Sequence, residues 1–266
     1  MAGRGGMFEY EFMWKALIAG VAIAVAAALL GTSLVLKRNS MIGDGLAHVS
    51  FGAMAVAVAV GVQPLLIAIP VSVAASVFLL SLNERHRGDS AIAMLSAVAL
   101  AIGVVAVSLS GTNIDINSYM FGSILAISDV NLVLSLGLVA IVGVFFAKYR
   151  KQIFALTIDE TFARAIGIRT RIYNMVFAAL ASVVIVLGMK LLGVLLVSSL
   201  IVFPNITAKY LARSFRSHTV LAVIIASVSF VLGLVFSYFL DIPTGPSVVV
   251  VSAVIYGFVR IISKLF

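Results

Sequence analysis

The sequence contains no cysteine and few charged residues, which make up only 11% of its 266 positions. The lack of cysteine excludes disulfide bonds and thiolate metal ligands. The shortage of charge excludes an ordinary soluble domain, in which about 25% of residues are charged and about 45–50% are apolar. Because 63% of the residues are hydrophobic, the chain is predicted to be a membrane protein with no room for a soluble catalytic domain.

Motifs for nucleotide binding and hydrolysis are also missing. The chain has no GxxxxGK[ST], HExxH, GxSxG or paired-cysteine motif, so we expect neither a P-loop of its own nor an enzyme active site. Two of the three histidines, His86 and His218, lie beside arginines in predicted cytoplasmic loops, where we expect them to be solvated. Only His48 has apolar surroundings.

The apolar residues recur in runs of about 18–25, the length that crosses ~30 Å of hydrocarbon. This pattern predicts an all-α, polytopic integral membrane protein, a single transmembrane domain over residues 1–266 with about nine membrane-spanning helices (eight to ten fit the pattern). The run 172–203 would be about 48 Å long as one helix, so we expect a break near Gly188, Lys190 and Gly193. The expected spans are 13–36, 41–61, 64–82, 90–110, 129–147, 172–189, 191–211, 219–240 and 244–263.

The net charge of +8 is distributed asymmetrically. If the N-terminus lies outside and the C-terminus inside, all 18 Lys and Arg residues except Arg4, Lys15 and Lys190 fall on the cytoplasmic side, which leaves 15 there. The positive-inside rule favours this orientation. Because the basic residues lie in short loops between apolar runs, they indicate a cell membrane, the plasma membrane of a prokaryote, and a lipid bilayer as partner, with no role in binding nucleic acid.

Segment 111–128 is too short and too polar for a standard span. Its apolar part, residues 119–127, would reach less than halfway across the membrane. We therefore expect a helix that lies at the outer surface or dips into the membrane. A true crossing here would invert the orientation of every span before it.

The longest predicted cytoplasmic segment runs over residues 148–171. In it, Thr157 is predicted to cap a short helix with Glu160 at the third helical position, as in a capping box, and Gly167 is predicted to follow its end. The apolar face of this helix consists of Phe162, Ala163 and Ile166. A short amphipathic helix between two spans binds a partner protein or lies on the lipid surface. Docking to a protein is the preferred interpretation.

Asp44 and His48 are ionisable residues in an otherwise apolar stretch. Asp44 is the only Asp, Glu, Lys or Arg from Ile42 to Leu82, and His48 is the only histidine there. On a helix, the i,i+4 spacing places both side chains on one face. An ionisable residue at membrane depth costs at least about 2.5–3.5 kcal/mol, so it indicates a functional site.

The residues alone leave two interpretations of this pair open. Asp44 could cap the start of the second span, with His48 as a hydrogen-bonded interior residue. Alternatively, the carboxylate and the imidazole share a divalent ion such as Zn²⁺ or Mn²⁺, and Gly43 and Gly45 indicate a broken or late-starting helix of the kind that transporters use. Two ligands from one chain would leave the coordination open, which suits transit better than storage.

Other polar or helix-breaking residues are interpreted as structural, and Pro204, Asp241, Pro243 and Gly245 are grouped as structural turn residues. Pro204-Asn205 in the seventh span frees a backbone carbonyl and predicts a kink more strongly than a ligand. Asp241, Pro243 and Gly245 predict a rigid outer turn.

Four segments, in order along the chain, carry a family pattern. Gly43 to His48 match GD-x-x-[SA]-H, residues 159–167 (DETFARAIG) match a coupling segment, residues 193–208 match GxLLVxALLxxPxxxA, and residues 241–245 (DIPTG) match D-x-P-x-G. Together they make the chain resemble the ABC-3 class of permeases of metal-ion ABC importers, the group that includes the zinc and manganese permeases. Gly45, Val49 and Asn205 depart from the residues usual in that pattern.

The resemblance implies a type II-like ABC importer permease with Asp44 and His48 as metal ligands along the translocation path. It implies that a P-loop ATPase dimer, a second copy of the permease and an extracytoplasmic metal-binding protein are partners. Zn²⁺ or Mn²⁺ would be transported, with no permanently bound cofactor. The residues that it assigns to coupling with the ATPase are Asp159, Glu160, Phe162, Ala163, Arg164, Ile166 and Gly167.

Three rival functions remain at this point. A proton-coupled secondary metal transporter or channel would use Asp44 and His48 as a proton relay and would need no ATPase. A permease for a metal chelate such as a siderophore or cobalamin would give the pair no special role. An intramembrane enzyme is disfavoured because its catalytic motifs are absent.

Overall fold

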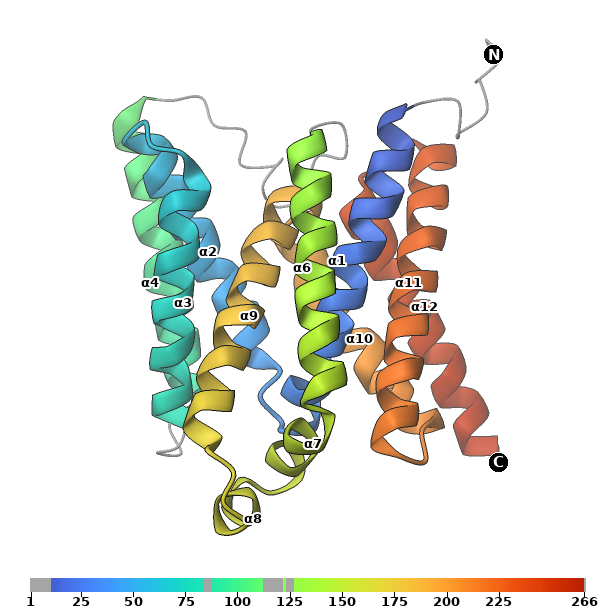
Figure 1. The fold of residues 1–266 in the computed structure, drawn as a ribbon. Helices are drawn as coiled ribbons and strands as arrows, with labels where there is room; N and C mark the ends of the chain where they lie inside the picture. Colours follow the sequence, from blue (N-terminus) through green and yellow to red (C-terminus); the bar gives the residue numbers. More distant parts are fainter. Residues whose placement is uncertain (1–10, 84–87, 112–121, 123–126, 266) are drawn as a thin grey trace.

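The computed structural model describes residues 11–83, 88–111, 122 and 127–265, and regular structure within these ranges is helical throughout. Nine long helices form an upright bundle, and two short helices, α7 and α8, lie together at one end of it (Figure 1). The helices are α1 Glu11–Leu36, α2 Met41–Ala59, α3 Pro64–Asn83, α4 Gly88–Ser110, α6 Asp129–Lys148, α7 Arg150–Ile158, α8 Glu160–Ala165, α9 Thr170–Leu192, α10 Val194–Leu211, α11 Phe215–Leu240 and α12 Thr244–Leu265.

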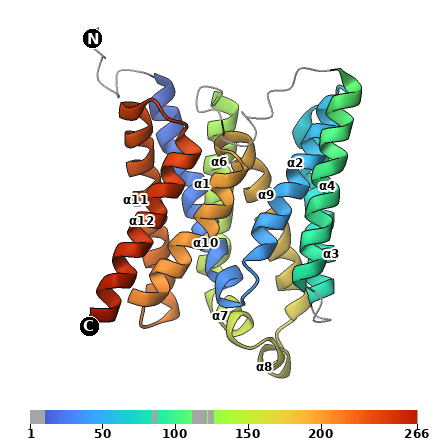
Figure 2. The ribbon, with the colours of Figure 1, turned by 180° about the vertical axis from the view of Figure 1, so that it is seen from behind.

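The long helices pack as two groups that α1, α9 and α10 join. In one group α2 contacts α3 and α4, and α9 contacts α3. In the other, α1 contacts α10 and α11, these two contact each other and α12, and α6 packs on α1. Viewed from behind, α2 and α10 lie at the front, next to each other at the junction of the two groups (Figure 2).

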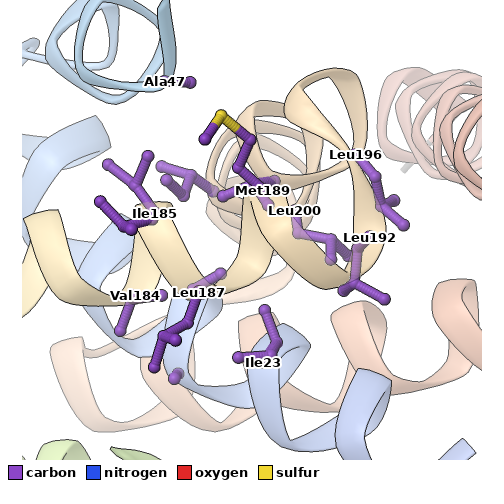
Figure 3. Close-up of a cluster of buried hydrophobic side chains, with 14 of the residues drawn as sticks. Ile23, Ala47, Val184, Ile185, Leu187, Met189, Leu192, Leu196 and Leu200 are labelled. Atoms are coloured by element: carbon purple, nitrogen blue, oxygen red, sulfur yellow. The ribbon is translucent and has the colours of Figure 1, made fainter. Parts of the chain in front are cut away.

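The hydrophobic core lies where these groups meet. Ile23 of α1, Ile185 and Met189 of α9, and Leu200 of α10 are almost completely buried and converge on one another (Figure 3). Helices α1 and α2 are mostly buried, whereas α4 and α12 expose most of their apolar surface. An apolar helix that remains exposed fits a lipid environment, because hydrocarbon solvates its side chains as well as a protein interior does.

The helices confirm the predicted all-α, polytopic architecture. Among the described residues, eight helices are long and apolar enough to cross a membrane, and the shorter apolar stretch Pro64–Leu79 belongs to α3, which packs between α2 and α9. The break predicted within residues 172–203 occurs at Gly193, whose φ of 91° separates α9 from α10. A polytopic α-helical bundle of this kind places the protein in the cell membrane.

Most of segment 111–128 lies outside the described residues, so the surface or dipping helix expected there remains a prediction. The flanking helices nevertheless bear on the topology. Helix α4 ends at Ser110 and α6 begins at Asp129 on the same face of the bundle, opposite α7 and α8 (Figure 1). The two helices that flank the segment thus meet it at the same face of the bundle.

Small residues allow α2 and α4 to approach closely. A Cβ atom at Gly52 would collide with the backbone carbonyl of Ala99, and Gly103 lies against the backbone of Gly52. In a membrane, van der Waals contact through such small residues replaces the hydrophobic drive as the main cause of helix association. This contact fixes the position of α2, the helix that carries Asp44 and His48.

The residues interpreted as turns fall in two different settings. The turn around Asp241 is present: α11 ends at Leu240, Asp241 has a left-handed backbone with φ of 52°, and α12 begins at Thr244. Pro243 lies in this turn and Gly245 lies in the first turn of α12. Pro204 is different, because it lies inside α10, which continues to Leu211. It forms no turn, and the grouping of Pro204 with the turn residues was wrong.

Candidate metal path and coupling segment

Asp44 and His48 lie on one face of α2, as their spacing predicts. The Oδ2 atom of Asp44 is 3.7 Å from Nε2 of His48, and the two side chains are 52% and 33% exposed. Helix α2 begins at Met41, so Asp44 lies in its first turn and not at its N-cap, which is Ser40. The capping interpretation is therefore wrong, and so is the broken helix, because α2 runs without interruption through Gly43 and Gly45.

The pair faces outward from a helix that is otherwise packed. Every residue from Ile42 to Ser50 except Asp44 and His48 is buried. Gly43 lies against the side chain of Ile201 in α10, and Gly45 lies against Ile92 in α4. Together with the exposed Met41, Asp44 and His48 form a stripe at i, i+3 and i+7 that no described element of this chain covers. The glycines thus bury one side of α2 and leave the opposite side free.

The described residues supply only these two ligands. No group of three or more His, Cys, Asp or Glu side chains in the described part of the chain is arranged to hold a metal ion. A carboxylate oxygen and an imidazole nitrogen suit Zn²⁺ and Mn²⁺, but a closed site needs at least four donors. Asp44 and His48 alone would therefore not close a metal site, and further donors would have to come from water or from another chain.

Segment 148–171, which was predicted to be cytoplasmic, contains two short helices, α7 and α8, where one was expected. The N-cap of α8 is Asp159, whose Oδ1 accepts hydrogen bonds from the backbone N–H groups of Thr161 at 2.8 Å and Phe162 at 3.0 Å. The predicted capping box was wrong, because Thr157 belongs to the preceding helix α7. The predicted end is confirmed, since α8 closes at Ala165 and Gly167 follows with φ of 84°.

Thr157 instead ties the coupling segment to the bundle. Its buried hydroxyl is 2.9 Å from the hydroxyl of Ser33 in α1 and donates a hydrogen bond to the carbonyl of Ile153 at 2.6 Å. Ala163 of α8 is also fully buried. Buried polar groups are found almost always with partners, and here the partner comes from a helix 124 positions away in sequence.

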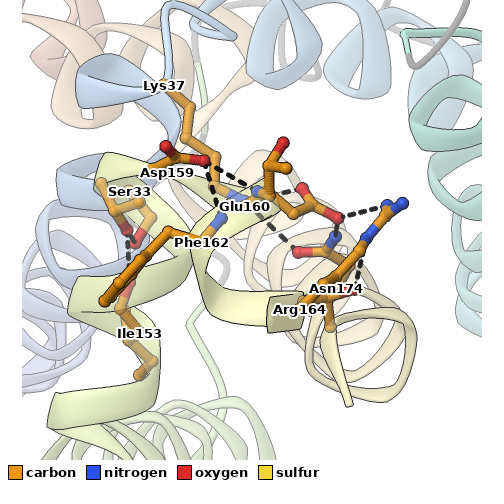
Figure 4. A network of polar contacts seen from close by, with 11 residues as sticks. Ser33, Lys37, Ile153, Asp159, Glu160, Phe162, Arg164 and Asn174 are labelled. Atoms are coloured by element: carbon orange, nitrogen blue, oxygen red, sulfur yellow. Dashed lines mark hydrogen bonds and ion pairs between the residues drawn. The ribbon is translucent and has the colours of Figure 1, made fainter. Parts of the chain in front are cut away.

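Glu160 is the centre of a polar network that joins three elements (Figure 4). Its Oε1 accepts hydrogen bonds from Nη2 of Arg164 at 2.9 Å and from Nδ2 of Asn174 in α9 at 3.0 Å. Its Oε2 lies 3.8 Å from Nζ of Lys37, just beyond the end of α1. Lys37 in turn donates to Oδ1 of Asn174 at 3.3 Å. Glu160 therefore points into its own chain.

The surroundings of Glu160 and Lys37 change the pKa of each group. Burial raises the pKa of Glu160, but the hydrogen bonds from Arg164 and Asn174 and the charge of Lys37 outweigh it, so that the pKa lies below the ordinary value. Burial lowers the pKa of Lys37, and the charge of Glu160 opposes this change only in part. The pair is a partly buried ion pair, which is costly to break from one side only.

The outward face of α8 is apolar and exposed. Phe162 is 57% exposed and Ile166 is 55% exposed. They lie in or directly after α8, the part of the chain that projects farthest from the bundle (Figure 1). Large apolar side chains at such a position mark an interaction surface. The predicted coupling residues thus divide into outward ones, such as Phe162 and Ile166, and inward ones, such as Glu160.

Two polar residues were interpreted incompletely from the sequence. Asn205 of α10 is fully buried, donates to the carbonyls of Ala28 at 3.1 Å and Ile201 at 2.8 Å, and accepts a hydrogen bond from Thr32 at 3.1 Å. Nothing in the sequence near Asn205 indicates these α1 partners. His218, expected to be solvated, is buried in the first turn of α11. That expectation was wrong, and His86 lies outside the described residues.

Comparison with known proteins places the chain in a family. The model of the ABC 3 transport family matches residues 9–263. A probable metal transport system membrane protein of Treponema pallidum is 32% identical over 252 residues, which cover 94% of each chain. The high-affinity zinc uptake system membrane protein ZnuB of Haemophilus influenzae is 27% identical over 251 residues, which cover 93% of this chain and 96% of that one.

A solved structure has the same fold. PsaBC from Streptococcus pneumoniae in complex with a Fab superimposes with a TM-score of 0.86 at 25% sequence identity, covering 96% of this chain and 92% of the other. The family match extends over almost the whole sequence, and it confirms the resemblance that four short segments indicated. The chain belongs to the ABC 3 transport family, as a membrane-embedded permease subunit and not an enzyme.

Proposed function

We infer that this protein is the permease of an ATP-driven importer and that it passes Zn²⁺ or Mn²⁺ inward through a site formed by Asp44 and His48. The observation that carries this proposal is the open stripe on α2. Two ionisable side chains lie 3.7 Å apart on an otherwise packed apolar helix, and no other group of the described chain satisfies them. A carboxylate and an imidazole kept unpaired at membrane depth have a cost that a transported cation would offset.

A second copy of the permease would complete this site. A two-fold axis beside α2 would bring the partner's equivalent stripe to face this one and would supply two oxygen and two nitrogen donors, the coordination number that zinc prefers. On ideal helix geometry, Asp44 and His48 lie about 5 and 10 Å along the axis from the start of α2. The ion would therefore stop close to the cytoplasmic end of the path.

The ATPase would dock on α8. Its exposed Phe162 and Ile166 would fill an apolar groove in the partner, and the ABC importers to which the family belongs supply ATP hydrolysis from a separate subunit. An extracytoplasmic metal-binding protein would approach the opposite end of the bundle, where Lys15 and Lys190 lie. This assignment gives the N-terminus outside and the C-terminus inside.

Glu160 gives the docked ATPase a route to the metal site. Its contact with Lys37 joins α8 to the end of α1, and residues 37–40 connect that point directly to Met41, where α2 begins. Thr157 and Ser33 hold the neighbouring turn of α7 to α1. A displacement of α8 would move the start of α2, on which Asp44 lies, without passing through the lipid-facing helices.

Metal uptake by proteoliposomes that contain the permease and its ATPase tests the proposal. Asp44→Ala and His48→Ala are expected to abolish ATP-dependent import of ⁶⁵Zn²⁺ and ⁵⁴Mn²⁺ while leaving assembly with the ATPase intact. Met41→Leu, on the same exposed stripe, is the matched control and should import normally.

Three outcomes would contradict the proposal. Normal import by either alanine variant would show that the substituted residue is not a metal ligand. Import without the ATPase would favour a proton-coupled transporter. Uptake of a siderophore or cobalamin in place of the free ions would favour a chelate permease.

A further inference from the structure

A hollow lies between the C-terminal end of α6 and the N-terminal end of α9, beside α7. It has a volume of about 520 Å³. Phe145, Ile172 and Val176 form its apolar part, which extends along the helices toward the middle of the bilayer. Gln152 and Arg169 lie at its cytoplasmic rim. The hollow is thus apolar toward the membrane and polar toward the cytoplasm.

Aromatic and basic residues shape this rim. The rings of Tyr149 and Tyr173 meet edge to face with their centres 5.5 Å apart, and Nζ of Lys148 lies 5.6 Å from the centre of the Tyr149 ring. A shallower hollow of about 430 Å³ along α6, lined by Lys148 and Val144, adjoins the first and shares Phe145 and Tyr149 with it. The two hollows therefore form one continuous surface.

The charges on this surface have one sign. Lys148 and Arg169 line it, and none of its lining residues is acidic. Tyrosine is typical of the level at which lipid headgroups begin, and basic pockets between helices on the cytoplasmic side bind anionic headgroups. The apolar residues Ile172 and Val176 are one turn apart on α9, about 6 Å along its axis, so they can contact the first part of an acyl chain that runs along the helix.

We propose that this hollow is a binding site for an anionic phospholipid, with its phosphate at Lys148 and Arg169 and an acyl chain against Ile172 and Val176. Helix α6, which forms one wall of the hollow, lies on the opposite side of the bundle from α2 and α10 (Figures 1 and 2). The proposal rests on the orientation assigned under the proposed function, with α7 and α8 on the cytoplasmic side, but not on the metal site. The hollow directly adjoins Gly167 and Ile168, which connect α8 to α9. A bound lipid would hold the coupling segment against the membrane surface.

Native mass spectrometry of the permease–ATPase complex measures this binding. Each basic residue near an anionic membrane contributes about fivefold to affinity, so Lys148→Gln with Arg169→Gln should weaken retention of phosphatidylglycerol roughly 30-fold relative to phosphatidylcholine. Arg213→Gln, between α10 and α11, with Arg216→Gln, in the first turn of α11, removes the same charge elsewhere and should change retention little. Equal losses in both pairs, or no loss in the first, would overturn the site.

Free glycerol 3-phosphate distinguishes a lipid from a soluble phosphate compound. If the site takes a lipid, glycerol 3-phosphate at the same concentration should not displace phosphatidylglycerol. Displacement would show that the hollow binds a soluble phosphate and would overturn the lipid assignment.

The absence of cysteine permits a local measurement as well. A fluorophore attached at Ile172→Cys should be quenched at least about twice as strongly by phosphatidylglycerol with brominated acyl chains as by brominated phosphatidylcholine. The matched label at Val98→Cys, on the exposed face of α4, should be quenched equally by both. Equal quenching at position 172, or protection of that label from both lipids by the bound ATPase, would contradict the proposal.

Discussion

The two regions that carry the proposed function treat their ionisable residues in opposite ways. On α2, Asp44 and His48 have only each other, at 3.7 Å, and both are partly exposed. In the coupling segment, Glu160 is bound to Arg164, Asn174 and Lys37, from three different elements. The pair on α2 is left open for the metal ion that we propose it binds. The polar groups around Glu160, in contrast, find their partners within the chain.

This difference separates the expected consequences of mutation. An unpartnered residue can be replaced without loss of stability, so its replacement affects only what it binds. A partnered residue holds elements together, and its loss leaves another polar or charged group unsatisfied, at a cost of about 1–3 kcal/mol. Substitutions of Asp44 or His48 should therefore reduce metal import without changing stability. Substitutions around Glu160 should reduce both.

Asp44→Asn should have the largest effect. The substitution keeps the shape of the side chain and removes its charge, so metal import should fall at least about 100-fold, given that even groups supporting a ligand contribute 10–100-fold. The unfolding temperature of the purified permease should stay within experimental error, because no described contact of this chain except that with His48 is lost. A marked loss of stability would show that Asp44 is a structural residue after all.

Phe162→Ala should have the next largest effect, on assembly. A central apolar anchor of an interface contributes about 2 kcal/mol or more, so the affinity of the permease for its ATPase should fall about 30-fold. The stability of the isolated permease should change by less than about 0.5 kcal/mol because the side chain is exposed. Phe258→Ala, equally exposed but on α12, serves as the control. Unchanged ATPase affinity in Phe162→Ala would move the docking surface away from α8.

Glu160→Gln should lower stability and coupling together. It weakens the hydrogen bonds from Arg164 and Asn174 and removes the counter-charge of the partly buried Lys37, which should cost about 1–2 kcal/mol in the free energy of unfolding. Import per ATP hydrolysed should also fall, because α8 would no longer be fixed to the end of α1. Denaturation in mild detergent and a paired transport and hydrolysis assay measure the two effects.

A double-mutant cycle with Lys37→Met isolates the ion pair. If the contact stabilises the fold as inferred, the two substitutions should be non-additive by about 0.5–2 kcal/mol. Additive effects would mean that Glu160 acts only through Arg164 and Asn174. The route from α8 to α1 would then have to pass through Thr157 and Ser33.

The sequence predicts one of these regions better than the other, for a physical reason. Asp44 and His48 stand out because their own neighbours are apolar, and the i,i+4 spacing is a local property of α2. The network around Glu160 depends on Lys37, more than a hundred positions earlier, and on the fold that brings the two together. The hydrogen bonds of Asn205 are equally hard to predict from the sequence, since its partners Ala28 and Thr32 are on α1.

The positions of the long helices could be predicted from the length and hydrophobicity of the apolar runs. Helix breaks predicted from glycine and the N-cap predicted from threonine were less reliable. Gly193 broke a helix where the run was too long for the membrane, as predicted. Gly43 and Gly45 instead allow close packing inside a continuous helix. Thr157 is not an N-cap, because α7 extends through it. Its hydroxyl contacts the buried hydroxyl of Ser33 instead. Tertiary contacts decided each of these cases.

The smallest expected effect is the pH dependence of the Glu160 network. Because the pKa of Glu160 in the folded protein lies below its ordinary value of 4.5, the carboxylate stabilises the fold above pH 4.5, and this contribution is lost as the pH falls through the lower, folded-state pKa. After solvent screening is allowed for, the contribution is on the order of a few tenths to 1 kcal/mol. Unfolding temperatures of the wild type and Glu160→Gln, measured from pH 3 to 8, should differ most at neutral pH and converge toward pH 3. Two curves that remain parallel down to pH 3 would mean that the charge of Glu160 contributes nothing, and that the network is held by the geometry of its hydrogen bonds alone.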